Sequence, residues 1–171
     1  MIGAIIGDIV GSRFEFDNTN DFNFGLFTEE CAYTDDTICT IAVADAAMND
    51  LSYGVALHSW CRRYPEPMGD YGCSFADWID SNDPQPYNSF GNGSAMRVSA
   101  IGWLFNTLEQ VVDEATKSAM PTHNHPEGIK GAVATAIAVF IARTDGKEAM
   151  LEAMKNYYPY WEEPRLGENE F

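Results

Sequence analysis

Residues 126–143 read PEGIKGAVATAIAVFIAR, and this stretch decides the fold class. A proline followed by a glutamate is typical of a helix start, and the alanines beyond it are strong helix formers. Gly128, Gly131, Ala134 and Ala138 predict a small-residue face for tight packing against other helices. The stretch therefore predicts one long helix.

The sequence on either side of this helix predicts further helices. Ile2, Ile6 and Ile9 recur at helical spacing, so a short amphipathic helix should open the chain and bury its apolar face. Thr34 is a candidate N-cap, and Thr107 with Gln110 has the spacing of a capping box. The other helices are expected over about 34–48, 52–63, 75–79, 94–105, 107–119 and 147–157. No stretch alternates as a strand would, so the predicted class is all-α.

The length and composition predict one domain. With 171 residues, 46% of them hydrophobic, the chain can bury one sizeable core. We expect this helical domain to cover residues 1–157. Residues 158–171 contain prolines, a glycine and several acids, and they predict an irregular acidic tail.

The charge balance excludes some partners. The formal net charge is −16, from 26 acidic and 10 basic residues, so attraction to nucleic acid or anionic lipid is disfavoured. The longest apolar run, residues 132–142, is too short to span a bilayer. No basic segment precedes the first apolar residues, as it would in a signal peptide. A cytoplasmic location is therefore expected, without membrane or nucleic-acid binding.

Two acidic features are candidates for chemistry. Thr34, Asp35 and Asp36 place a hydroxyl and two carboxylates at a helix start, and such hard oxygens suit Mg²⁺ or Mn²⁺. Taken alone, these residues are better explained by an ordinary N-cap followed by acidic first-turn residues. Glu15 follows the first helix, where it is either a solvated side chain or, if buried near a metal, a general base.

Two further segments are candidates for ligand binding. Residues 88–97 form a glycine-bearing loop that opens into a helix, where backbone N–H groups can hold a phosphate. A plain turn with Ser94 as N-cap is the alternative. Before the long helix, His123 and His125 are separated by one residue. We expect one of them to contact a ligand and the other to cap the helix.

Four stretches of the sequence, taken in order, resemble the ADP-ribosylglycohydrolase family. They are residues 3–12 with Glu15, residues 33–37, residues 88–97 and residues 122–131. The resemblance implies a compact, orthogonal all-α bundle. It also implies a binuclear Mg²⁺ or Mn²⁺ site in a cleft for ADP-ribose.

The resemblance also implies roles for individual residues. The implied metal ligands are Thr34, Asp35 and Asp36. The implied catalytic residues are Glu15 and Asp35. The implied substrate-binding residues are Gly91, Asn92, Gly93, Ser94 and His123.

The chain departs from the family at one point. Members carry a second metal-binding stretch, Gly-Gly-Asp-x-Asp-Thr, near the C-terminus, and nothing here fits it. Beyond residue 100 the aspartates are Asp113 and Asp145, neither in such a setting. The resemblance is therefore to the N-terminal two-thirds of the family's fold, C-terminally truncated.

Two functions follow from the resemblance and the departure. The first is hydrolysis of the N- or O-glycosidic bond between ADP-ribose and a modified side chain or small molecule. The missing carboxylates would then come from another protomer or from the tail residues Glu162, Glu163, Glu168 and Glu170. The second is a catalytically incomplete module that binds ADP-ribose, a nucleotide or a protein. In either case a shortened core should expose an apolar face, which favours a homodimer or a completing partner chain.

Overall fold

The computed structural model describes residues 1–21 and 23–157. The helices of these residues are α1 (Ile2–Gly11), α2 (Asp35–Asn49), α3 (Tyr53–Arg63), α4 (Cys73–Asp80), α5 (Gly93–Met96), α6 (Ser99–Leu104), α7 (Leu108–Ala119), α8 (Pro126–Thr144) and α9 (Lys147–Tyr157), with a 3-10 helix at Ser12–Phe14. The β pairing within the described ranges is one isolated bridge between Thr34 and Met68. The predicted all-α class is confirmed.

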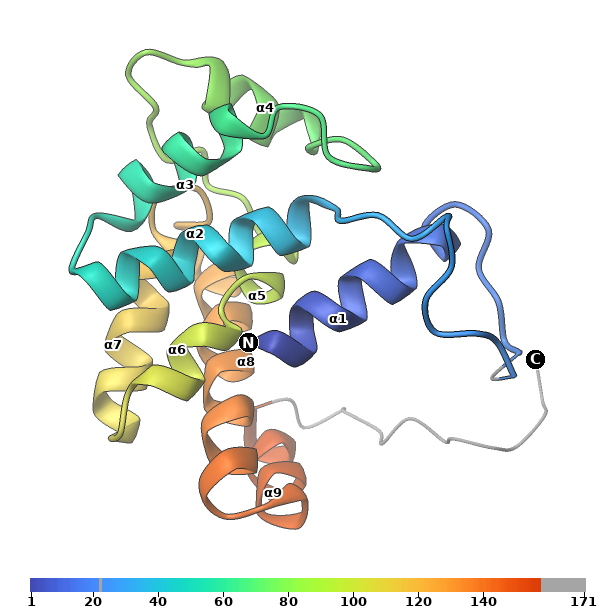
Figure 1. Cartoon of the computed structure of the whole chain (residues 1–171). Helices are drawn as coiled ribbons and strands as arrows, with labels where there is room; N and C mark the ends of the chain where they lie inside the picture. Colours follow the sequence, from blue (N-terminus) through green and yellow to red (C-terminus); the bar gives the residue numbers. More distant parts are fainter. Residues whose placement is uncertain (22, 158–171) are drawn as a thin grey trace.

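The long helix α8 is the centre of one packing layer. It contacts α5, α6, α7 and α9, and Figure 1 shows it running behind α5 and α6. Ala132 and Ala136 have no exposed surface, and Ile137 is almost fully buried. Small side chains let neighbouring backbones approach closely, which accounts for the packing of this helix on several others.

The second layer is built on α2, which contacts α1, α3 and α6. Cys39, Ala42 and Val43 of α2 are fully buried, as is Leu57 of α3. The core lies between these helices and the α8 layer. Its arrangement directs the N-terminal end of α2, with the acidic pair, away from the centre of the bundle (Figure 1).

The predicted caps of two helices are confirmed. The hydroxyl of Thr34 accepts a hydrogen bond from the backbone N–H of Asp36 at 3.2 Å. Thr107 accepts one from the N–H of Gln110 at 3.3 Å. Each bond satisfies an N–H group that the first turn of a helix would otherwise leave without a partner.

The prediction of one helix over residues 94–105 is wrong. The segment divides into α5 and α6, because Arg97 and Val98 have ψ angles of −6° and −4° that interrupt the regular helix. Arg97 is 1% exposed, and its guanidinium reaches oxygens of Ser118 and Thr122. The interruption lets this charged side chain enter the interior and reach those acceptors.

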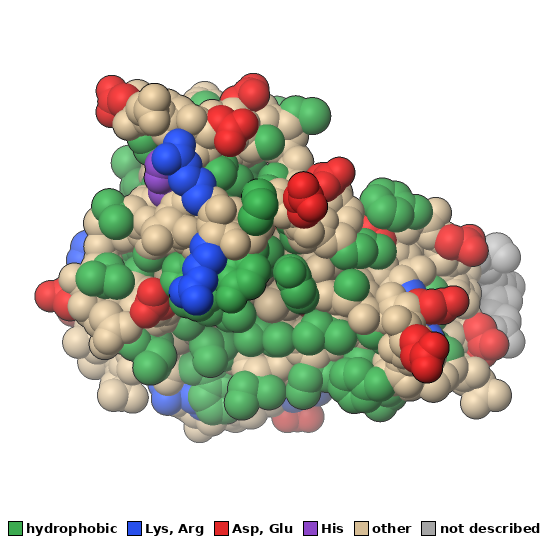
Figure 2. Space-filling view, turned by 45° about the horizontal axis from the view of Figure 1, so that its top comes forward, with side chains coloured by type: hydrophobic (Ala, Val, Ile, Leu, Met, Phe, Trp, Pro, Cys, Tyr) green, Lys and Arg blue, Asp and Glu red, His purple; other side chains and the backbone are tan. Residues whose placement is uncertain are grey.

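The prediction that α1 buries its apolar face is also wrong for the described residues. No residue of α1 is buried, and Ile2 is 69% exposed. Among the described helices, α1 packs mainly on α2. The first residues of α1 line a groove of about 540 Å³, which Met48 and Trp103 also line. Figure 2 shows hydrophobic side chains gathered across the lower part of one face of the molecule.

Two other predictions concern membrane spanning and the acidic tail. None of the helices within it combines the length and hydropathy that a bilayer crossing requires. The predicted acidic tail, residues 158–171 with its four glutamates, lies outside the described residues.

The two glycines near the start of α8 provide a test of the packing. A Cβ atom at Gly128 would lie 2.6 Å from the carbonyl oxygen of Ser89, whereas one at Gly131 would lie 3.8 Å from the Cβ of Ala95. We expect Gly128→Ala to lower the free energy of unfolding by about 2 kcal/mol, because overpacking against backbone costs about 1–3 kcal/mol. Gly131→Ala should leave it unchanged or raise it by up to about 1 kcal/mol.

Urea unfolding of the two variants measures this difference. Equal effects of the two substitutions would contradict the close approach of α8 to the segment that contains Ser89.

Candidate functional site

The N-terminal end of α2 is held by the carboxylate of Asp8, which lies on α1. Asp8 accepts hydrogen bonds from the Thr34 backbone N–H at 3.0 Å and from the Thr34 hydroxyl at 2.6 Å. It also accepts bonds from the backbone N–H and the hydroxyl of Thr37. Four donors on one carboxylate fix the start of α2 against α1. Sequence reasoning assigned no role to Asp8; an acid inside an apolar helical run was the available signal.

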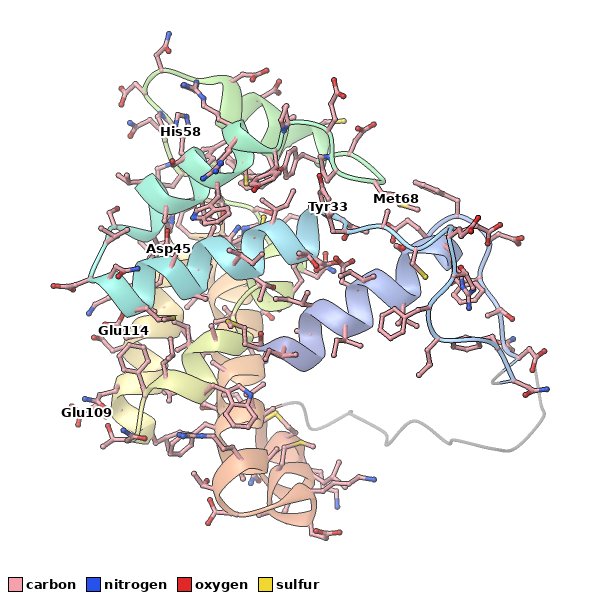
Figure 3. All side chains as sticks on the ribbon, in the orientation of Figure 1. Tyr33, Asp45, His58, Met68, Glu109 and Glu114 are labelled. Carbon is pink, nitrogen blue, oxygen red and sulfur yellow. The ribbon has the colours of Figure 1, made fainter. Side chains whose placement is uncertain are left out.

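These bonds orient the hydroxyl of Thr34. Its proton is donated to Asp8, and one lone pair accepts the N–H of Asp36. A hydroxyl oxygen has two lone pairs, so one of them stays available to a further ligand. Thr34 is 3% exposed. The residue before it, Tyr33, connects this segment to the loop before α4, because its carbonyl accepts a hydrogen bond from the backbone N–H of Met68 at 3.2 Å (Figure 3).

Asp35 and Asp36 follow in the first turn of α2 and are partly buried. Burial, together with the negative charges of Asp36, Asp8 and Glu15, raises the pKa of Asp35 to about 6. Burial also raises the pKa of Asp36, and the charges of Asp8 and Glu15 add to the effect. Four carboxylates therefore repel one another at this end of the helix, and a cation would relieve that repulsion.

Glu15 lies at the edge of this acidic group. It follows the 3-10 helix after α1 and is exposed, with its side chain beside Gly69. Its charge acts on both Asp35 and Asp36. Glu15 does not line the pocket that adjoins Asp35, which is described next. The structure thus brings it near the predicted metal ligands but on their solvent side.

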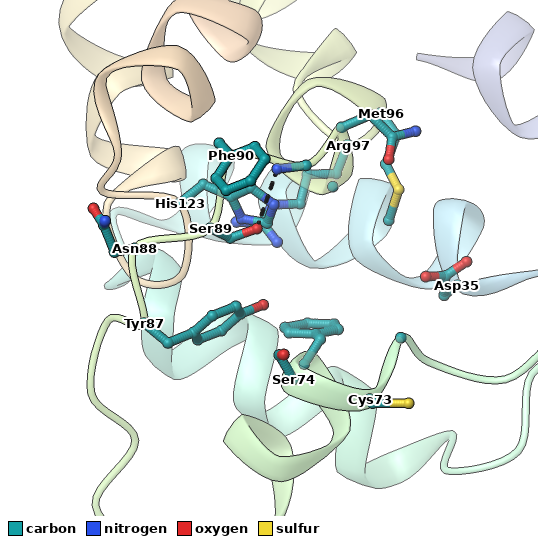
Figure 4. A pocket seen from close by; sticks show the side chains of 15 residues that line it. Asp35, Cys73, Ser74, Tyr87, Asn88, Ser89, Phe90, Met96, Arg97 and His123 are labelled. Carbon is teal, nitrogen blue, oxygen red and sulfur yellow. Dashed lines mark hydrogen bonds between the residues drawn. The ribbon is translucent and has the colours of Figure 1, made fainter.

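A pocket of about 520 Å³ adjoins Asp35. Figure 4 shows Asp35 at one end of it and Asn88 at the other. The other lining residues are Gly72, Cys73, Ser74, Phe75, Tyr87, residues 89–93, Met96, Arg97 and His123. Three segments that are far apart in the sequence, namely the start of α2, the glycine loop and the histidine segment, therefore meet at a single cavity.

The glycine loop is fastened to the segment before α8. The backbone N–H of Ser89 donates to the carbonyl of Thr122 at 3.2 Å, and that of Asn88 donates to the side chain of Asn124 at 2.7 Å. The fully buried hydroxyl of Ser94 donates to the carbonyl of Gly128 at 2.8 Å. Gly91, Asn92 and Gly93 line the pocket, whereas Ser94 holds the loop in place from behind.

The two histidines have different positions, as the spacing predicted. The Nδ1 atom of His125 accepts the backbone N–H of Glu127 at 3.1 Å and so caps α8. His123 is 4% exposed and lines the pocket. Burial, together with the positive charge of Arg97, lowers the pKa of His123 to about 4, so its ring is neutral at pH 7.

Arg97 is a pocket residue that sequence reasoning missed. It is 1% exposed, and its Nη2 atom donates to the Ser118 carbonyl at 3.1 Å and to the Thr122 hydroxyl at 2.9 Å. Both acceptors are neutral, so a buried positive charge lies under the pocket without a bonded carboxylate. Arg97 ends the segment 88–97, but the apolar residues that follow it in the sequence indicated only a buried helix.

The donor atoms at the start of α2 fit a hard divalent cation in their chemistry. Two carboxylates and a hydroxyl with a free lone pair are the oxygens that Mg²⁺ and Mn²⁺ prefer. Within the described residues, however, no three histidine, cysteine or acidic side chains are grouped as a ready metal site. Thr34, Asp35 and Asp36 would therefore supply only one side of such a coordination sphere.

Comparisons with known proteins show the family to which the chain belongs. The model of the ADP-ribosylglycohydrolase family matches residues 1–169, and the chain belongs to this family. It is 28% identical over 175 residues to the ADP-ribosylhydrolase ARH3 of Homo sapiens, an alignment that covers 83% of this chain and 48% of that protein. The Xenopus tropicalis ARH3 is 24% identical over 170 residues, with 83% and 49% covered. The chain thus spans about half the length of these relatives.

Replacing Asp8 tests whether it fixes the start of α2. We expect Asp8→Asn to lower the free energy of unfolding by about 2–3 kcal/mol, because the amide loses charge-assisted bonds and turns N–H groups toward the donors of Thr34 and Thr37. Asp17→Asn, in the exposed loop after the same helix, is the matched control and should change it by less than about 0.5 kcal/mol.

Chemical denaturation of both variants provides the measurement. Equal stability of Asp8→Asn and the control would show that the four bonds do not hold α2.

Proposed function

We propose that this chain binds ADP-ribose in the pocket beside Asp35 and takes part in hydrolysis of the glycosidic bond that joins ADP-ribose to a modified side chain or small molecule. The observation that carries the proposal is the meeting of Asp35, the glycine loop and His123 at one cavity of about 520 Å³. Cavities of roughly 300–1,000 Å³ are typical of small-ligand sites. Membership of the family supports ADP-ribose as the ligand.

Charge determines the direction in which ADP-ribose lies. The diphosphate is anionic, and Arg97 provides buried positive charge under the glycine loop. The acidic group at the start of α2 would repel phosphate. We therefore place the diphosphate against residues 89–93 and His123, and the distal ribose toward Asp35.

Aromatic side chains line the pocket on the side of the nucleotide. Phe75, Tyr87 and Phe90 belong to the lining, and Phe90 is 74% exposed. Aromatic rings stack on nucleobases, with a gain of about 1–3 kcal/mol per base. We assign the adenosine part of the ligand to this aromatic side.

At the other end, the carboxylates act on the distal ribose. Water attacks the anomeric carbon, the bond to the leaving group breaks, and positive charge develops on the ribose ring. Asp35 stabilises that charge, and Glu15 accepts the proton released by the water. The departing group takes up a proton from solvent as it leaves, and Glu15 then returns the proton of the attacking water to solvent.

A divalent cation fits the same end of the pocket. Thr34, Asp35 and Asp36 would hold it, and it would supply charge neutralisation and Lewis-acid polarisation there. The remaining ligands would come from residues outside those described. Burial raises the pKa values of Asp35 and Asp36, and repulsion from neighbouring carboxylates adds to the effect; a cation would offset both, which supports this assignment.

A second candidate function is binding of ADP-ribose without turnover. The observation that favours it is that the described residues hold no group of three histidine, cysteine or acidic side chains that could bind a metal ion. Both candidates use the same pocket, so ligand binding tests the pocket and product release separates the two.

Isothermal titration of Mn²⁺ tests the ligand assignment. In Asp35→Asn with Asp36→Asn we expect Mn²⁺ affinity to fall by more than about 100-fold, since loss of outer-sphere partners alone costs about 10–100-fold. The substitutions relieve repulsion, so the variant should fold. The charge-matched control is Glu109→Gln with Asp113→Asn on α7. Neither residue lines the pocket, and Figure 3 labels Glu109 on this helix. This control should bind Mn²⁺ as the unaltered protein does.

A release assay on ADP-ribosylated peptides, with and without Mn²⁺, then separates the candidates. Release that requires Asp35 and Asp36 supports hydrolysis. ADP-ribose binding without release supports the binding module, and failure to bind ADP-ribose in either condition contradicts both.

A further inference from the structure

A chain of hydrogen bonds runs from Arg97 through Thr122 to His123 beneath the pocket. The Arg97 guanidinium donates to the Thr122 hydroxyl oxygen at 2.9 Å. The same oxygen lies 2.7 Å from the Nδ1 atom of His123. Arg97 is 1% exposed, Thr122 0% and His123 4%, so solvent does not compete for these bonds.

The direction of the second bond follows from the first. Arginine has donors only, so the Thr122 oxygen must be the acceptor of the Arg97 bond. Thr122 still carries one hydroxyl proton, and His123 Nδ1 is the neighbouring acceptor. The hydroxyl therefore donates to Nδ1, which must then be unprotonated. The single proton of the neutral ring is left on Nε2.

The opposite tautomer would leave a buried proton without a partner. If Nδ1 carried the ring proton, it would donate to Thr122, and the Thr122 hydroxyl proton would lose that acceptor. A buried donor without a hydrogen bond costs about 1–3 kcal/mol. This difference favours the Nε2–H tautomer by about fivefold or more. The proximity of the Arg97 charge also disfavours the doubly protonated ring, in agreement with its lowered pKa.

The Nε2 side of the ring faces the glycine loop. A Cβ atom at Gly93 would lie 3.1 Å from Nε2, and one at Gly91 would lie 4.0 Å from it. The lack of side chains at these glycines leaves the Nε2–H group access to a ligand that lies along the loop. Figure 4 shows His123 beside Ser89 and Phe90 in the pocket wall.

We propose that Arg97 and Thr122 are positioning residues that lock His123 as a neutral Nε2–H donor, directed at an anionic oxygen of the ligand's diphosphate. The inference rests on the proposed function for the identity of the ligand, but the locked tautomer is a property of the ligand-free protein. Arg97 acts in two ways, because its bond turns the Thr122 proton toward Nδ1 and its charge favours an anion in the pocket.

The test is ¹⁵N NMR of the histidine rings in the ligand-free protein at pH 7. His123→Gln identifies the signals of His123 by their loss, and His58 and His125 serve as internal references. We expect His123 to show a pyrrole-like Nε2 and a pyridine-like Nδ1. In Thr122→Val, which removes the hydroxyl, the His123 signals should move toward a mixture of tautomers while those of His58 and His125 stay in place.

Thr122→Ser keeps the hydroxyl and is the matched control. It should preserve the tautomer and bind ADP-ribose within about twofold of the unaltered protein, whereas Thr122→Val should bind it about tenfold more weakly, as expected for one lost hydrogen bond. A role of Thr122 in stability alone would change the unfolding midpoint and leave the ring signals unmoved. If Thr122→Val does not fold, the spectrum of Thr122→Ser and the unaltered protein still decides the tautomer.

Three results would overturn the inference. They are an Nδ1–H tautomer in the unaltered protein, an unchanged Nε2–H tautomer in folded Thr122→Val, and equal ADP-ribose affinity of the two Thr122 variants. An Nε2–H tautomer in a protein that binds no ADP-ribose would instead contradict the proposed function.

Discussion

The attachment of the glycine loop to the start of α8 is the constraint on which the site depends. Ser94 donates to the carbonyl of Gly128, and Gly128 lies so close to the carbonyl of Ser89 that a side chain at this position would collide with it. The loop and the histidine segment are therefore one unit, although more than 30 residues separate them. His123 can reach the pocket only because this unit brings its ring beside the loop.

A second unit, α1 with the start of α2, provides the other end of the pocket. Asp8 is itself a carboxylate beside other acids, and the four hydrogen bonds that it accepts hold Thr34 and Thr37 in place. Asp35 and Asp36 are thereby kept partly buried beside other carboxylates, and this burial and the neighbouring charges raise their pKa values. The two units give the pocket opposite electrostatic ends, with Arg97 under one and carboxylates at the other.

Local chemistry explains how much could be predicted from the sequence. The caps at Thr34 and Thr107 depend on residues within one turn, so their patterns were sufficient. The capping of α8 by one of the two histidines before it was also predicted, because a cap acts within the first turn. Burial of α1 could not be judged, because a helical period indicates an apolar face but does not identify what covers it.

The roles of Asp8 and Arg97 required contacts between distant segments. Asp8 acts on residues 26 and 29 positions away, and Arg97 acts on residues 21 and 25 positions away. No pattern within a single helix carries such information. The family resemblance identified the segments of the site but not the bonds that join them.

The central claim is that Asp35, the glycine loop and His123 form one ADP-ribose site. A titration of the ¹⁵N-labelled protein with ADP-ribose, followed by amide chemical shifts, tests it most directly. The account predicts that the amides of residues 89–94, His123 and Asp35 shift together and saturate with one affinity. Shifts confined to the separate cleft lined by Tyr53 and Glu114, or no saturable shifts at all, would contradict it.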